Sequence, residues 1–124
     1  MKKLSILLFF ITGFSSLQAW GADFAKGLAA HKSGDYATAL KEWTPLAEQG
    51  DAVAQYNLAV SFTLGQGVIG DNVYAHMWAN IARSNGSENA SKVFDIIVKK
   101  MTPAQIEKAQ DLARECVKKN YKGC

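Results

Sequence analysis

Apolar side chains recur every three or four positions through most of the chain, which is the spacing of one face of an α-helix. The pattern is clearest in residues 52–86, which predict two short amphipathic helices joined by a glycine-rich turn at residues 65–70. Landmarks of this segment recur at a constant offset of 36 residues. The matched pairs are Asp35 with Asp71, Ala39 with Ala75, Gly50 with Gly86, Ala54 with Ala90, and Leu58 with Phe94. A fixed offset of this length is typical of stacked helical repeats.

Start and stop signals divide the chain after residue 22 into six predicted helices. Residues able to cap a helix N-terminus begin them: Asp23, Asp35, Asp51, Asp71, Ser87 and Thr102. The helices run from residue 24 to about 33, from 36 to 49, from 52 to the turn at 65, from 72 to about 84, from 88 to 100, and from 103 to about 119. Pro45 predicts a kink in the second helix, or resumption of the helix after Thr44. No run alternates apolar and polar residues, so no strand is expected.

The first 21 residues predict an export signal. Two lysines precede an apolar run at residues 4–14, and a polar stretch with small residues follows. Cleavage after Gly21 places small side chains at the two positions that need them, and makes Ala22 the mature N-terminus. The alternative is an uncleaved membrane anchor, but this run of eleven residues is shorter than the roughly 17 to 25 of a spanning helix. No cysteine lies near the cleavage site, which argues against a lipid-anchored lipoprotein.

Removal of residues 1–21 lowers the formal net charge from +3 to +1, because that segment holds two lysines and no acid. Residues 22–82 carry three lysines against six acids, whereas residues 83–124 carry nine basic groups against five acids. Such an asymmetry can steer an acidic partner toward the C-terminal part. The alternative is that these charges lie on solvated helix faces.

Residues 51–86 also carry a repeat motif made of small residues, an aromatic residue, a Gly-x-Gly-Val turn, and then Asp, Ala, Trp, Ala and Gly. The residues at these positions are Ala52, Ala54, Leu58, Phe62, Gly65, Gly67, Val68, Asp71, Ala75, Trp78, Ala82 and Gly86. The motif resembles the Sel-1-like repeat family, relatives of the tetratricopeptide repeat with two additional residues in the turn between helices. Ala59, Phe62 and Arg83 depart from it, because the family usually has glycine, tyrosine and alanine there.

The resemblance implies a shortened leading repeat at residues 22–50, a full repeat at 51–86, a divergent closing repeat at 87–119 and a tail at 120–124. It also implies an all-α, right-handed superhelix of helical hairpins, whose first helices line a concave face that holds other proteins. Residues that would line this groove are Ala25, Ala29, Val53, Tyr56, Val60, Lys92 and Ile96. A mostly apolar groove edged by lysine suits an amphipathic helix or an extended peptide with an acidic residue. So short an array is expected either to act as an accessory to a larger assembly or to self-associate through its ends.

Cys116 and Cys124 are the two cysteines, and in an exported protein they predict a disulfide. Continuous helix over these positions would hold them about 12 Å apart, beyond bridging range, so the chain has to reverse near Asn120 and Gly123. The alternative is a redox or metal pair, but the close Cys-x-x-Cys spacing of such sites is absent.

His31 and His76 are the two histidines. His31 occupies the aromatic position of the leading repeat, equivalent to Phe62, so we expect a half-buried packing role. His76 falls between Ala75 and Met77, and we expect it to point to solvent. Neither belongs to a His-Glu-x-x-His motif, and the sequence predicts no metal site and no cofactor.

Two further function classes remain alternatives to protein binding. Some secreted cysteine-rich relatives have been connected with β-lactam hydrolysis, but no serine here is followed three positions later by lysine, and no Gly-x-Ser-x-Gly motif is present. Nucleic-acid binding needs aromatic residues interleaved with the basic ones, and only Tyr121 qualifies. We therefore expect a non-enzymatic bacterial adaptor, periplasmic or secreted, that binds protein or peptide, binds no nucleic acid and has no membrane anchor after cleavage.

Overall fold

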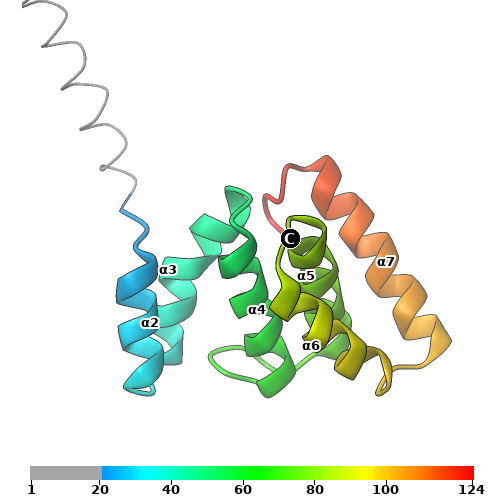
Figure 1. The fold of residues 1–124 in the computed structure, drawn as a ribbon, viewed down its shortest axis with the longest axis horizontal. Helices are drawn as coiled ribbons and strands as arrows, with labels where there is room; N and C mark the ends of the chain where they lie inside the picture. The colour runs from blue at the N-terminus through cyan, green and yellow to red at the C-terminus, as the bar shows by residue number, and fades with distance from the viewer. Residues whose placement is uncertain (1–20) are drawn as a thin grey trace, which may run out of the picture.

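A computed structural model describes residues 21–124, and residues 1–20 of the predicted export signal lie outside this range. Six helices follow one another along the described part (Figure 1). They are α2 (Phe24–Lys32), α3 (Tyr36–Glu48), α4 (Ala52–Leu64), α5 (Asn72–Ser84), α6 (Glu88–Val98) and α7 (Pro103–Lys118). Residues 21–124 form no strand, so the all-α prediction is confirmed for this range.

The helix starts repeat at the predicted interval. Asp35 caps α3 and Asp71 caps α5, while Asp51 caps α4 and Ser87 caps α6, each pair standing 36 residues apart. In every case the side-chain oxygen accepts from backbone N–H groups of the first turn, which would otherwise have no partner. The last helix starts as predicted, because Thr102 and Gln105 form a complete capping box.

Helix ends agree with the predicted ones to within two residues. The turns after α3 and α5 pass through Gly50 and Gly86, whose φ angles of 94° and 104° lie in the left-handed region that favours glycine. α3 continues through Pro45 to Glu48 without a break, so helix resumption after Thr44 is not needed. α6 ends at Val98, two residues before the predicted end.

Helix α5 is the centre of the array. It contacts α4, α6 and α7, whereas α2 packs mainly on α3, and α3 packs on α4 (Figure 1). The last two helices differ from a simple hairpin, because α6 and α7 both pack on α5 and make at most marginal contact with each other. This arrangement surrounds α5 on three sides.

The core contains four of the nine repeat-core positions that the sequence predicts. Leu58, Ala75, Trp78 and Ala82 are buried, and Trp78 is only 3% exposed. Phe62 is half-buried and stacks on Tyr74, with ring centroids 5.5 Å apart. The other predicted repeat positions, Gly65, Gly67, Asp71 and Gly86, lie in turns or at a helix start.

The C-terminal tail folds back onto the array. The Sγ atoms of Cys116 and Cys124 lie at bonding distance, 2.05 Å apart, in agreement with the predicted pairing. The chain reverses through Asn120, Tyr121 and Gly123, all of which have positive φ. Asn120 and Gly123 are the predicted reversal positions, whereas the sequence analysis does not predict the positive φ of Tyr121.

Each helix in residues 21–124 is too short or too polar to span a membrane.

Candidate functional site

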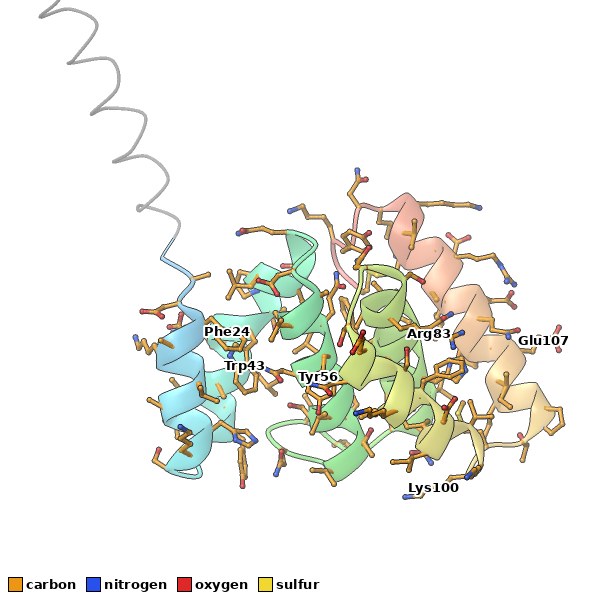
Figure 2. All side chains as sticks on the ribbon, in the orientation of Figure 1. Phe24, Trp43, Tyr56, Arg83, Lys100 and Glu107 are labelled. Atoms are coloured by element: carbon orange, nitrogen blue, oxygen red, sulfur yellow. A yellow bond between two sulfur atoms is a disulfide. The ribbon has the colours of Figure 1, made fainter. Side chains whose placement is uncertain are left out.

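Five of the seven predicted groove residues lie on two helices that contact each other. Val53, Tyr56 and Val60 belong to α4, and Lys92 and Ile96 belong to α6; we call these five residues the α4–α6 face. Val53 and Ile96 are 53% and 54% exposed, whereas Tyr56 and Val60 are half-buried. Figure 2 shows Tyr56 on the part of α4 that is near α6. The face therefore combines two half-buried and two exposed apolar side chains with one exposed lysine.

The other two predicted groove residues, Ala25 and Ala29, are exposed on α2. This helix packs mainly on α3 and makes at most marginal contact with α4, so the structure does not join the two alanines to the α4–α6 face. The packing of α2 depends on Trp43, whose ring lies 6.0 Å from that of Phe24 (Figure 2). The usable face is therefore shorter than the sequence suggests.

His31 has the packing role that we expected. Its ring is half-buried and lies 5.6 Å from the ring of Trp43 and 5.1 Å from that of Tyr36. Its Nε2 donates a hydrogen bond to Gln66 Oε1 at 3.1 Å, which ties α2 to the glycine-rich turn of the next repeat. These contacts are those of a structural side chain that links neighbouring elements.

The prediction that His76 points to solvent is wrong. The side chain is fully buried, with 0% exposure, and its ring centroid lies 4.4 Å from that of Phe94 on α6. Neither ring nitrogen has a hydrogen-bond partner among residues 21–124. Burial, together with the nearby positive charge of Arg83, lowers the pKa of His76 below its ordinary value of 6.5. A buried, neutral imidazole is therefore part of the core at the α5–α6 contact.

Arg83 on α5 stacks on Phe94, the ring that contacts His76. Its guanidinium carbon lies 3.6 Å from the centroid of the Phe94 ring, and its Nε donates to Asn80 Oδ1 at 3.1 Å. Stacking of a guanidinium on an aromatic face is favourable because the ring face carries partial negative charge. Figure 2 shows Arg83 near the region where α5, α6 and α7 meet.

A second surface feature was not predicted from the sequence. A groove of about 580 Å³ lies between α5 and α7, with Ile81 and Asn80 on one side and Gln110, Ala113, Arg114 and Val117 on the other. We call it the α5–α7 groove. It arises from the way in which α7 crosses α5, and helical periodicity within one segment carries no signal for that crossing.

The disulfide-closed tail forms one end of this groove. Tyr121 lines the groove, and its Oη donates to Asn85 Oδ1 at 3.4 Å. The amide of Asn85 also donates to the Oε1 of the fully buried Gln55 at 2.9 Å. The N–H of Gly123 donates to Glu48 Oε2 at 3.0 Å, so the tail contacts α3 as well as α5.

Residues 21–124 contain no group of three or more histidine, cysteine, aspartate or glutamate side chains placed to hold a metal ion.

A small cavity of about 100 Å³ lies near the tail, and the residues that line it include Met77, Leu112 and both cysteines. No protein-family model matches the chain, and no curated protein is similar to it at a significant level.

Proposed function

We propose that the chain is an exported helical-repeat protein of the Sel-1-like type that binds another protein or a peptide through the α4–α6 face. The observation that carries the proposal is the pair of large apolar side chains, Val53 and Ile96, that are more than half exposed on two contacting helices. Burying them against a partner would gain roughly 25 cal/mol for each Å² of apolar surface removed from water.

The repeat assignment is supported by the shared 36-residue interval between helix starts. Asp35 and Asp71 are equivalent caps, and so are Asp51 and Ser87. Repeats of this kind stack into a continuous surface, and three helix pairs are near the minimum that buries a repeat core.

The chemistry of the face suggests the nature of the partner. Its apolar residues include the half-buried Tyr56, and Lys92 lies on the same helix as Ile96. An amphipathic helix or an extended peptide that carries an acidic residue would complement this combination. The proposal requires no reaction at the site.

Three substitutions test the face. Tyr56→Ala and Val60→Asp should abolish recovery of the partner in pull-downs from the native cells, and Ile96→Asp should do the same at a position that the core does not need. Ile69→Asp is the matched control, because Ile69 is 91% exposed in the turn after α4 and lies outside the face. Circular dichroism should show unchanged helicity. Undiminished recovery with all three variants would refute the proposal.

Export is the second part of the proposal. It is supported by the lysines and apolar run at the start of the sequence, and by a cysteine pair at bonding distance, which is typical of proteins in oxidising compartments. Mass spectrometry of the periplasmic protein should find an N-terminus at Ala22. Recovery of the protein only in the cytoplasm, with Met1 retained, would contradict export.

A further inference from the structure

We propose that the α5–α7 groove is a second binding site, which takes an extended peptide segment that carries aliphatic and acidic side chains. The groove lies between the second helices of the last two pairs, whereas the α4–α6 face lies on first helices. The two surfaces share no residue, so this site stands or falls independently of the proposed function. Its volume of about 580 Å³ is within the usual range for small-ligand clefts, so the groove can hold a short stretch of a peptide.

The floor of the groove is apolar. Ile81 and Ala113 are 3% and 6% exposed, and they form a closed base between the two helices. Val117 lines the groove from α7 and is 52% exposed, although Ala113, one turn earlier on the same helix face, is buried. An aliphatic side chain placed between Ala113 and Val117 would cover this apolar surface.

The polar groups of the groove are suited to a peptide backbone. Asn80 on α5 and Gln110 on α7 both line it, and each carries an amide that can both donate and accept. Asn80 Oδ1 is already engaged by Arg83 Nε, which fixes the orientation of its amide and leaves the N–H groups to donate. A helical ligand satisfies its own backbone groups, whereas an extended chain needs partners of this kind. The amides therefore favour an extended segment.

The charged side chains that line the groove are all basic. Arg114 and Lys118 line it one turn apart on α7, and none of its lining residues is acidic. Each cation has an acidic neighbour three residues earlier, Asp111 and Glu115, but all four side chains are at least 60% exposed. Exposed ion pairs contribute little, so a carboxylate of the ligand can replace either partner at small cost. This charge complementarity selects an acidic peptide over a basic one.

The disulfide-closed tail sets the length of the groove. Tyr121 closes one end, and its position is fixed by Asn85 and by the link between Cys116 and Cys124. The edge of its ring also lies close to Gly50, where a Cβ would be 3.5 Å from the ring. A rigid end wall reduces the ordering that binding requires.

A defined peptide tests the site. The probe is an N-acetylated, C-amidated pentapeptide that alternates glutamate with leucine, and its control replaces each glutamate with lysine. Binding is followed by isothermal titration calorimetry and by shifts in the amide spectrum of isotope-labelled full-length mature protein. We expect the acidic peptide to shift signals of α5 and α7, and we expect the basic peptide to bind at least about tenfold more weakly.

Three variants test whether the acidic peptide binds in the α5–α7 groove. Val117→Asp and Arg114→Glu should each raise the Kd for the acidic peptide about tenfold or more, and both positions are exposed, so the fold should tolerate them. Val53→Asp is the matched control, because Val53 is 53% exposed but lies on the α4–α6 face. Its Kd should stay within about twofold of the wild-type value. The proposal is overturned if the acidic peptide does not bind, if the basic peptide binds equally well, or if Val53→Asp weakens binding and Val117→Asp does not.

Discussion

Replacing His76 tests the structure at the residue that the sequence pattern places in solvent and the structure places in the core. His76 is 0% exposed, and neither ring nitrogen has a hydrogen-bond partner among residues 21–124. A buried polar group without a partner costs about 1 to 3 kcal/mol. Leucine has a similar volume and no polar atom, so His76→Leu should raise the free energy of unfolding at pH 7.5 by about 1 to 3 kcal/mol.

The pH dependence of the same variant gives a second, independent readout. Burial and then the charge of Arg83 lower the pKa of His76 in the folded protein below its ordinary value of 6.5. Below pH 6.5 the unfolded chain therefore binds a proton that the folded protein does not, and wild-type stability falls as the pH drops toward the folded pKa. One such proton changes the free energy of unfolding by at most about 1.4 kcal/mol per pH unit. The advantage of His76→Leu over the wild type should grow over this range.

Urea denaturation followed by far-ultraviolet circular dichroism, at intervals from pH 7.5 to pH 5, measures both effects. His31→Leu is the matched control, because His31 is half-buried and donates a hydrogen bond to Gln66. It should lower stability by about 0.5 to 1.5 kcal/mol. If His76→Leu is less stable than the wild type by more than about 1 kcal/mol, or if its advantage does not change with pH, the imidazole is hydrogen-bonded or exposed in solution and our reasoning is wrong.

Two further predictions concern the tail and the repeat turn. The double substitution Cys116→Ser and Cys124→Ser should lower the free energy of unfolding by about 2 to 3 kcal/mol, as expected for opening a short loop; equal urea midpoints for the oxidised wild type and the variant would contradict a structural disulfide. Gly67→Ala should be more destabilising than Gly34→Ala in the same assay: φ is positive at both glycines, but a Cβ at 67 would lie 2.9 Å from the carbonyl oxygen of Tyr36, whereas at 34 no neighbour lies within 4 Å. Equal losses would mean that the turn is not packed against α3.

Much of the fold could be predicted because its signals are local. A capping side chain such as Asp71 satisfies backbone groups only two or three residues away, and a glycine such as Gly86 ends a helix through its own φ angle. These interactions do not depend on how helices are arranged. The sequence therefore predicted the helix starts correctly and the helix ends to within two residues.

The environment of His76 could not be predicted in the same way. The hairpin pattern gives α5 one buried face, formed by Ala75, Trp78 and Ala82, and places position 76 on the opposite side. In the structure α6 covers this side of α5, because the Phe94 ring lies 4.4 Å from the His76 ring, and seven of the thirteen residues of α5 are buried. Contact with the next helix is a property of the assembled array, and the periodicity of one helix carries no signal for it.

The α4–α6 face could be predicted from the sequence, whereas the α5–α7 groove could not. Tyr56 and Val60 could be assigned to one face because they are four residues apart on α4, and Lys92 and Ile96 could be paired on α6 for the same reason. The α5–α7 groove depends on the crossing of two helices that start 31 residues apart, and on a tail placed by the Cys116–Cys124 pair. Its residues become neighbours only in the folded chain.

Site-specific crosslinking in intact cells tests the central claim most directly. A photoreactive amino acid would replace Tyr56 or Ile96 on the α4–α6 face, and Lys41, which is exposed on α3, would carry it as the control. We predict that positions 56 and 96 give the same protein adduct in the periplasmic fraction, whereas position 41 does not. Adducts of equal yield at all three positions, or an adduct at position 41 alone, would contradict a protein-binding face on α4 and α6.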